Sequence, residues 1–323
     1  MIKKECFTAE WIEQVSSELH YNDKNLIEKV IRALSLLEML VKAGCPLVFK
    51  GGTALMLILG KSAHRLSIDI DLICPPGTNI EDYLKSFADF GFINLELVER
   101  KQRDDADIPK SHSKFFYQIA YRNDTDAQSY ILLDVLYEDI HYFRTQQIAI
   151  NCPFIRLEGK PLMVTVPSAE DILGDKLTAF APNTTGIPYY KNGRSCSMEI
   201  AKQLYDVGRL FENVSDLQIT KEAFRKIAVV ELSYRSFGTD IGQVFNDIRQ
   251  TALCISTRGK AGEGDFDLIQ DGIIRVKSFM YKQRYLIDHA IIDAARAAYL
   301  ATLIEKGINK IESYSNNPAD IKD

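Results

Sequence analysis

Two aspartates, Asp69 and Asp71, stand two residues apart in an otherwise apolar stretch. Side chains of a strand alternate between its faces, so a strand over 68–73 places both carboxylates on one face, roughly 6.6 Å apart along the chain. Unpaired neighbouring carboxylates repel each other, which raises the pKa of one of them. A hard divalent cation with oxygen ligands, such as Mg²⁺, relieves that repulsion. The spacing predicts that Asp69 and Asp71 hold one such ion, or two that share an oxygen.

The pair Gly51-Gly52 separates a predicted strand over 47–50 from a predicted short helix over 53–59. Glycine adopts backbone angles closed to other residues and has no Cβ to keep a ligand away. Free N–H groups and the positive end of the dipole make a helix N-terminus an anion site. A Gly-Gly turn or a D-x-D pair alone is common in ordinary turns and strand ends. Their order and spacing here predict a site for a nucleoside triphosphate carried with Mg²⁺.

A third carboxylate, Asp134, interrupts an apolar run over 129–137. A strand that is apolar on both faces is predicted to be central and buried, and a buried carboxylate is costly unless it is paired or metal-bound. We therefore predict that Asp134 is the third metal ligand. The alternative is a carboxylate at the strand end, satisfied by backbone groups.

One lysine, Lys176, falls within the apolar stripe of a predicted helix over 169–180, which Ser168 caps. A lysine on a buried helix face needs a nearby anion or must lose its proton. Its ammonium is predicted to reach the triphosphate. The alternative is a lysine that extends to solvent at the rim of the domain.

The segments FKGGTAL and RLSIDIDL, over 49–55 and 65–72, resemble the signature of the AbiEii-type nucleotidyltransferases, which include the MenT-type toxins. That family belongs to the polymerase-beta-like superfamily, whose pattern is a Gly-Gly or Gly-Ser turn, a D-x-D strand and a later carboxylate. EDILGDKLTAF resembles the family motif around its lysine, and KQLYDVGRL resembles R-D-L-Y-D-L, with Asp206 at the functional acidic position. The chain departs from this pattern at Lys202 and Gln203, where the family commonly has Arg and Asp, which puts any ion pair between those two positions in doubt.

The resemblance and the residues together imply an enzyme that transfers a nucleoside monophosphate from an NTP to an acceptor hydroxyl and releases pyrophosphate. The expected catalytic residues are Asp69, Asp71, Lys176 and Asp206, and the expected metal ligands, for two Mg²⁺ ions, are Asp69, Asp71 and Asp134. The expected nucleotide-binding residues are Gly51, Gly52, Thr53, Arg65 and Ser67. The family also implies a toxin of a toxin–antitoxin or phage-defence pair, with tRNA 3′ ends as acceptor and an antitoxin as partner.

The 323 residues carry 39 basic and 44 acidic side chains, a net charge of −5, which argues against a surface that coats nucleic acid broadly. Six dispersed cysteines without a pairing pattern indicate reduced thiols in a cytoplasmic protein. No apolar run is long enough to span a membrane, and the N-terminus lacks a signal core. We expect no membrane association.

The elements predict an α+β fold in which helices flank a mixed sheet, followed by a mostly helical region. We divide the chain into a nucleotidyltransferase-like domain over 1–165 and a helical domain over 166–323 that contributes residues to the active-site cleft. The expected helices of the first domain span 8–19, 23–43 and 80–90, and its later strands span 92–98, 114–121, 129–137 and 162–166.

Two clusters suggest contacts with RNA, although a solvated surface is the alternative for both. The first is the set of basic residues Arg100, Lys101, Arg103, Lys110 and Lys114. The second is a loop over 181–195 that interleaves Tyr189 and Tyr190 with Lys191 and Arg194.

Two other functions fit the same residues. Other members of the superfamily transfer a nucleotide to a small molecule or to a protein side chain, and the net charge does not separate these acceptors from RNA. A non-catalytic protein that binds NTP and regulates a partner is the third possibility. The complete set of Gly-Gly turn, D-x-D pair and third carboxylate argues against it.

Overall fold

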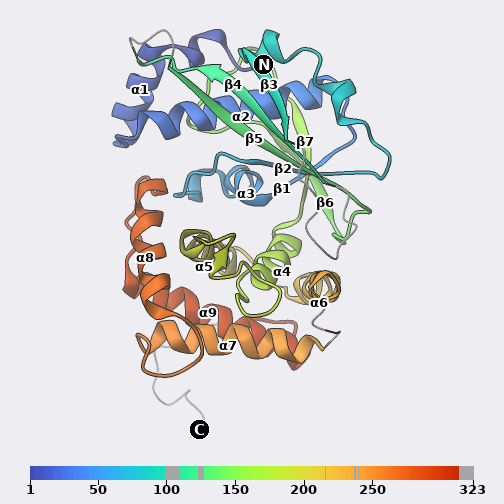
Figure 1. Ribbon diagram of the computed structural model, residues 1–323, viewed down its shortest axis with the longest axis vertical. Coiled ribbons are helices and arrows are strands. Elements are labelled where there is room, and N and C mark those ends of the chain that lie inside the picture. Colours follow the sequence, from blue (N-terminus) through green and yellow to red (C-terminus); the bar gives the residue numbers. More distant parts are fainter. Residues whose placement is uncertain (99–109, 123–126, 215, 236–237, 239, 313–323) are drawn as a thin grey trace.

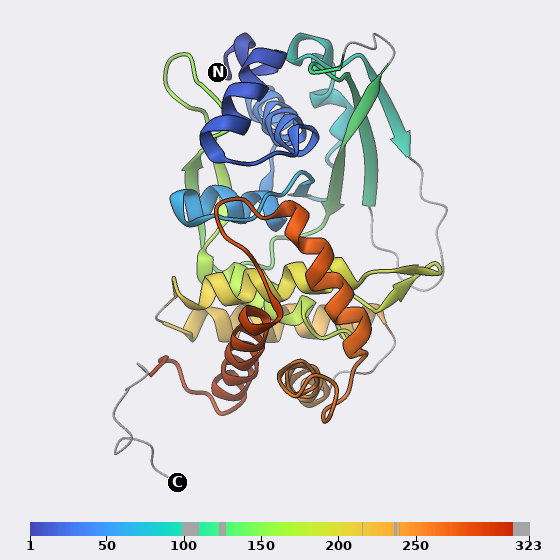
Figure 2. The ribbon, with the colours of Figure 1, turned by 90° about the vertical axis from the view of Figure 1, so that its left-hand side faces the viewer.

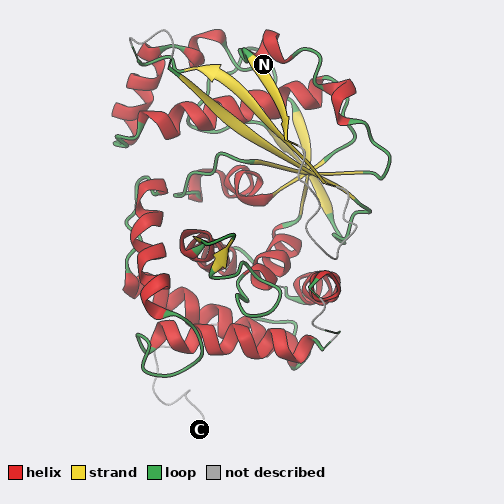
Figure 3. Cartoon of the chain, viewed as in Figure 1, coloured by secondary structure: helices red, strands yellow, loops and turns green. Residues whose placement is uncertain are grey.

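The computed structural model describes residues 1–98, 110–122, 127–214, 216–235, 238 and 240–312. Within these ranges a five-stranded mixed sheet and its helices occupy one half of the molecule, and helices α4 to α9 occupy the other (Figure 1). Figure 3 shows the same division, with most strands in one half and mainly helices in the other. The predicted α+β class is confirmed.

The helices of the first half are α1 (Ala9–Leu19), α2 (Lys24–Lys42) and α3 (Gly51–Leu59). Its strands are β1 (Val48–Lys50), β2 (Ile70–Cys74), β3 (Asn94–Val98), β4 (Lys110–Gln118), β5 (Gln128–Tyr137), β6 (Thr145–Ala149) and β7 (Met163–Pro167). The second half contains α4 (Ala169–Ala179), β8 (Tyr190–Lys191), β9 (Arg194–Ser195), α5 (Ser197–Phe211), α6 (Gln218–Tyr234), α7 (Ile241–Ser256), α8 (Phe266–Val276) and α9 (Ile287–Glu305). Short 3₁₀ turns complete the set: η1 (Lys4–Phe7), η2 (Gly60–Ser62), η3 (Ile80–Tyr83), η4 (Phe87–Phe90) and η5 (Lys277–Phe279).

The main sheet has the strand order β1-β2-β5-β4-β3, so β5 is central, as its apolar run predicts. β2 and β5 run parallel, and the other neighbours are antiparallel. On β2 the alternating side chains of Ile70 and Leu72 are fully buried in the same cluster as the apolar stripe of α2. The aspartate between them therefore projects from the opposite face.

Buried apolar side chains form two clusters. One gathers residues from 2 to 166 together with Tyr281, and the other gathers residues from 172 to 304 together with Leu55. We propose on this basis that the chain folds as two units that meet near residue 166. Among the described residues, no helix is both long enough and apolar enough to cross a lipid bilayer.

Several predicted elements differ from the structure. The segment over 80–90 forms the 3₁₀ turns η3 and η4 instead of one α-helix. Its end is held by α2, where Ser35 donates to the Phe90 carbonyl at 3.1 Å and Arg32 donates to the Gly91 carbonyl at 3.0 Å. These bonds anchor the end of the segment to α2.

The boundaries of two elements also differ from the predicted ones. The helix after β1 begins at Gly51, two residues before its predicted start, and β2 begins at Ile70, so Asp69 precedes the strand. The strand β6 was not predicted, and the predicted loop over 181–195 contains the hairpin β8–β9. The charged run over 99–107 lies outside the described residues.

The contact between α4 and α6 depends on Gly174. A Cβ at this position would lie 2.8 Å from the backbone nitrogen of Phe224 and 2.8 Å from the carbonyl oxygen of Thr220. Alanine normally favours a helix over glycine by about 1 kcal/mol. Here we expect Gly174→Ala to lower the free energy of unfolding by about 1–3 kcal/mol, because the two helices must separate. Urea denaturation measures this, and a variant as stable as the wild type would contradict the close packing.

Candidate active site

Two of the predicted metal ligands lie side by side. Asp71 on β2 is in register with Asp134 on β5. Neighbouring strands run about 4.8 Å apart, so the two residues are adjacent and their side chains project from the same face. Burial, the charge of Asp69 and that of Asp134 together raise the pKa of Asp71 to about 7. The fold therefore brings Asp69, Asp71 and Asp134 within electrostatic reach of one another.

The position of Asp69 is fixed by its backbone. The hydroxyl of Thr53 on α3 donates to the Asp69 carbonyl oxygen at 2.7 Å, and Thr53 is fully buried. Burial raises the pKa of the Asp69 carboxyl, Lys202 opposes this shift, and Asp134 adds to it. This hydroxyl connects the glycine turn to the start of β2, whereas the predicted contact of Thr53 with phosphate uses its backbone N–H and stays a prediction.

The glycine turn lies directly against the carboxylates. A Cβ on Gly51, whose φ is +79°, would lie 2.1 Å from a carboxylate oxygen of Asp71. A Cβ on Gly52 would lie 2.6 Å from the hydroxyl oxygen of Ser67 and 3.0 Å from Nη2 of Arg65. No side chain caps the N-terminus of α3, so its first N–H groups face this site without a side-chain acceptor. The predicted nucleotide-binding residues thus surround one turn of backbone.

A buried ion cluster connects the two halves of the molecule. The guanidinium of Arg65 donates to both carboxylate oxygens of Asp206 on α5, at 2.8 Å from Nη2 to each and 3.0 Å from Nε to Oδ1. The ammonium of Lys176 lies 3.0 Å from Oδ2 of the same carboxylate and donates to Gln203 at 2.9 Å. Burial alone would raise the pKa of Asp206, but Arg65 and then Lys176 outweigh it and lower that pKa.

The structure corrects three site expectations. Asp134 lies on a central strand, yet its side chain is 39% exposed, so the prediction that it is buried was wrong. The spacing of the apolar residues Ile200, Leu204, Val207 and Phe211 predicts that Asp206 points away from the packed face of its helix. It is nevertheless only 1% exposed, because helices and the Arg65 loop enclose α5 on more than one side. Lys176 is buried as predicted, but its ammonium contacts Asp206 and is not free to reach a ligand on its own.

Two side chains at the site were not assigned roles from the sequence. Lys202 lies one helical turn before Asp206, with its ammonium 4.0 Å from the ring centroid of Phe279. Burial and then Arg65 lower the pKa of Lys202 to about 8, against the pull of Glu199, Asp69 and Asp206. The i, i+4 spacing to Asp206 was the available signal.

The second side chain to which the sequence assigned no role is His112 on β4. It is in register with Asp134, and its Nδ1 forms a close contact with Oδ1 of that carboxylate. Its Nε2 is buried and has no partner among the described residues. His112 lay just outside the predicted strand over 114–121, so its pairing with Asp134 was not predicted.

The donor set fits a hard divalent cation. Three carboxylates lie within electrostatic reach of one another, and burial together with the charges of Asp69 and Asp134 raises the pKa of Asp71, which a bound cation would lower. Within the described ranges, no three acidic, histidine or cysteine side chains are gathered closely enough to surround an ion as they stand. Oδ1 of Asp134 contacts His112, so its other oxygen, Oδ2, would be the one to reach an ion shared with Asp69 and Asp71.

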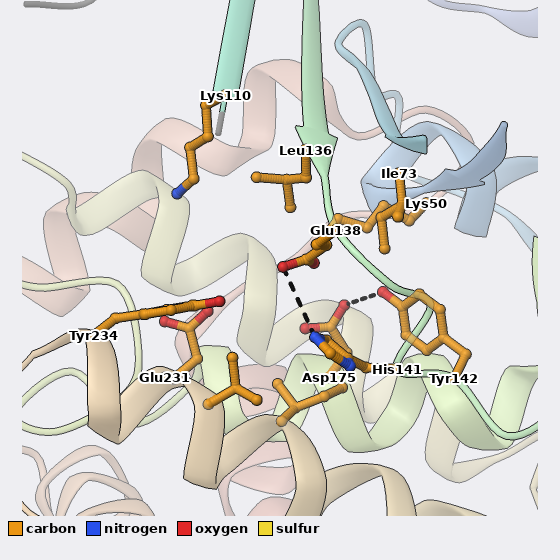
Figure 4. A pocket seen from close by; sticks show the side chains of 12 residues that line it. Lys50, Ile73, Lys110, Leu136, Glu138, His141, Tyr142, Asp175, Glu231 and Tyr234 are labelled. Carbon is orange, nitrogen blue, oxygen red and sulfur yellow. Dashed lines mark hydrogen bonds and ion pairs between the residues drawn. The ribbon is translucent and has the colours of Figure 1, made fainter. Parts of the chain in front are cut away.

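A cavity of about 60 Å³ continues along this face of the sheet beyond the carboxylates. Ile73 and Leu136, two residues after Asp71 and Asp134, form part of its wall (Figure 4). Lys50 and Lys110 also line it, and Figure 4 shows the Lys110 ammonium directed inward. The remaining lining residues come from the segment after β5, from α4 and from α6: Glu138, His141, Tyr142, Asp175, Ile227, Val230, Glu231 and Tyr234.

The basic residues proposed for RNA contact differ in where they lie and in whether an acidic side chain compensates their charge. Arg100, Lys101 and Arg103 lie outside the described residues. Lys114 contacts Glu96 across the β3–β4 pair at 3.2 Å, so its charge is locally compensated. Lys110 remains at the cavity.

Comparisons with known proteins point to one family. A family model described as "Nucleotidyl transferase AbiEii toxin, Type IV TA system" matches residues 34–295. No curated protein matches significantly.

Solved structures resemble the fold at low identity. JHP933 from Helicobacter pylori is 15% identical, with a TM-score of 0.43 over 95% of this chain and 95% of that one. MenT4, a nucleotidyltransferase toxin from Mycobacterium tuberculosis, is 13% identical, with a TM-score of 0.48 over 90% of this chain and 89% of that one. Similarities at this level carry no information on the reaction.

The ion cluster makes a stability prediction. Asp206→Ala leaves two buried cations, Arg65 and Lys176, without their shared counter-ion, so we expect the free energy of unfolding to fall by about 3–5 kcal/mol. Asp206→Asn keeps an acceptor oxygen, so its free energy of unfolding should fall by less. Chemical denaturation at neutral pH compares the two. An Asp206→Ala protein with wild-type stability would show that the cluster does not hold the halves together.

Proposed function

Because the chain belongs to the AbiEii family of nucleotidyltransferase toxins from type IV toxin–antitoxin systems, we propose that it transfers a nucleoside monophosphate from an NTP to a hydroxyl at the 3′ end of tRNA. Membership makes it a nucleotidyltransferase and gives it an NTP as substrate and an antitoxin as partner. The acceptor, the metal ion and a role in phage defence are our proposals. The observation that supports the chemistry best is the pairing of Asp71 with Asp134 beside Gly51.

Asp69, Asp71 and Asp134 would hold two Mg²⁺ ions. Bound there, the metal would supply a lowered pKa for the attacking hydroxyl and compensation for the charge of the leaving pyrophosphate. The three carboxylates provide only oxygen ligands, which suits Mg²⁺ better than a softer metal. His112 contacts Asp134 and so orients one of these carboxylates from β4.

The first turn of α3 would bind the β- and γ-phosphates. Its N–H groups have no side-chain cap, and the absence of a Cβ at Gly51 and Gly52 lets phosphate oxygens approach the backbone. Ser67 lies beneath Gly52 and can donate its hydroxyl to the same phosphates. Thr53 acts indirectly, because its hydroxyl holds Asp69 in place.

The cluster of Arg65, Lys176 and Asp206 would act as one unit with a net charge of +1. Nη2 of Arg65 lies beside the glycine turn and donates to both carboxylate oxygens of Asp206, so the cation is pre-oriented before the substrate arrives. Lys176 and Asp206 therefore contribute by positioning and by charge. Lys202, whose charge acts on Asp69, adds a second positive charge on the same side.

The biological setting follows from the family and the substrates. A toxin that blocks the 3′ ends of tRNA would stop translation, and the antitoxin would restrain it until release. We place this reaction in the cytoplasm, because NTPs and tRNA are found there. A role against phage would use the same arrest of translation.

The catalytic proposal predicts a loss of transfer when one carboxylate loses its charge. Asp71→Asn should reduce incorporation of α-labelled NTP into total tRNA at least about 100-fold, because it removes a metal ligand. Asp89→Asn is the matched control, since Asp89 is exposed and its change should leave the rate unaltered. If wild type and Asp71→Asn label tRNA equally, the assignment fails. If label appears only in a protein or a small molecule, the tRNA acceptor is wrong but nucleotidyl transfer still stands.

The raised pKa of Asp71 predicts how metal affinity depends on pH. Below about pH 7 a proton occupies this carboxyl in the free protein and competes with the cation. Affinity for Mn²⁺ or Mg²⁺ should therefore rise by up to about tenfold per pH unit below 7 and level off above it. Calorimetric titration at pH 6, 7 and 8 measures this. An affinity that does not change over this range would contradict the assignment of Asp71.

A further inference from the structure

The β8–β9 hairpin takes no part in the chemistry described above. Tyr190 pairs with Ser195 and Lys191 pairs with Arg194. The two turn residues, Asn192 and Gly193, both have positive φ, +53° and +74°, as the two-residue turn of a tight hairpin requires. Figure 2 shows the hairpin extending outward from the start of α5.

The hairpin exposes an aromatic ring beside two cations. Tyr190 is 57% exposed, and Lys191 and Arg194 are also exposed. Within the described part of the chain, neither cation forms an ion pair. Lys191 and Arg194 lie directly opposite each other, and like charges in this position destabilise a strand pair. An anion that lies across both side chains would relieve this repulsion.

The basic character continues from the hairpin toward the carboxylates. The charges of Lys191 and Lys50 act on Lys110, the first residue of β4. The hairpin therefore lies within electrostatic range of the β4 side of the site. Lys110 is in register with Leu136, two residues beyond Asp134, and both line the cavity of Figure 4. Lys191, Lys110 and Lys50 thus place positive charges between the hairpin and the carboxylate face, beside the acidic side chains Glu138 and Glu231 that line the same cavity.

The direction of transfer selects this side for the acceptor. In phosphoryl transfer the attacking and leaving oxygens lie roughly in line, on opposite sides of the phosphorus. The turn that we assign to the triphosphate follows β1, at one edge of the strand order β1-β2-β5-β4-β3. The leaving pyrophosphate is on that side, so the acceptor must approach across Asp71 and Asp134 from the β4 side.

We propose that the β8–β9 hairpin docks the single-stranded 3′ end of the RNA acceptor, with Tyr190 stacked on a base and Lys191 and Arg194 on phosphates. Aromatic side chains interleaved with cations bind single strands in this way, because every base has a face to stack and every linkage carries a negative charge. The inference rests on the proposed transfer to RNA and adds to it the surface that holds the acceptor.

The test measures binding separately from chemistry. The probes are labelled tRNA and a short single-stranded RNA with the same 3′ sequence, titrated by fluorescence anisotropy without NTP or metal. Tyr190→Ala should weaken binding about tenfold, through the loss of one stacking contact. Arg194→Glu should weaken it by at least about tenfold and lower the slope of log affinity against log salt by about 0.7 or more.

Arg194→Glu also guards against misfolding. It places opposite charges across the hairpin, so its thermal stability should equal or exceed that of the wild type. Lys160→Glu is the matched control. It makes a charge change of the same sign and size on an exposed loop beside the N-terminus, where the Met1 amino group donates to Glu158. In transfer assays the hairpin variants should raise KM for RNA and leave KM for NTP unchanged.

The outcomes separate the two proposals. If the wild type labels RNA and the hairpin variants bind RNA as well as Lys160→Glu does, the hairpin inference is overturned and the proposed function stands. If the wild type labels a protein and neither binds nor labels RNA, the RNA acceptor and the hairpin inference both fail while nucleotidyl transfer remains. Weaker RNA binding with an unchanged KM for NTP supports both.

Discussion

The parallel register between β2 and β5 is the constraint on which the rest of the site depends. It sets Asp71 opposite Asp134, and the charges of Lys50 and Lys176 offset only part of the burial and repulsion that raise the pKa of Asp71. A shift of one residue would move one carboxylate to the packed face of the sheet. The fully buried side chains of Ile70 and Leu133 prevent such a shift, because it would expose them. The hydrophobic core thus maintains an arrangement of like charges that favours a bound cation.

The buried cluster of Arg65, Lys176 and Asp206 has a different role. Arg65 belongs to the loop before Asp69, whereas Lys176 and Asp206 belong to α4 and α5, so the cluster joins the sheet to the helical half. One carboxylate holds two cations, and the surplus positive charge lies next to the glycine turn. Stability and the electrostatics of the site therefore come from the same contacts. This explains how a helix far from Asp69 in the sequence contributes to the face that we assign to the nucleotide.

Much of this arrangement could be predicted because it follows from local rules. The alternation of side chains along a strand correctly predicted the faces of Asp71 and its neighbours, and the glycine pair predicted the turn. Contacts between segments that are distant in the sequence were harder to predict. The spacing of apolar residues on α5 describes only one packed face, so it missed the burial of Asp206 by Arg65. The exposure of Asp134 was missed because an apolar run does not show where a sheet face is left uncovered. The segment over 80–90 has helical spacing, yet it forms two separate 3₁₀ turns whose end is hydrogen-bonded to α2, a contact that local spacing does not reveal.

The central claim is that Asp69, Asp71 and Asp134 share divalent cations beside the first turn of α3. A crystal structure with Mn²⁺ and a non-hydrolysable NTP analogue tests it most directly, because anomalous scattering locates manganese without reference to the surrounding atoms. We expect manganese within about 2.0–2.3 Å of oxygens from all three carboxylates and of the triphosphate, with the β- and γ-phosphates at the N–H groups of Gly51 and Gly52. Manganese bound elsewhere, or an Asp134 that still contacts only His112 when nucleotide is bound, would contradict the account.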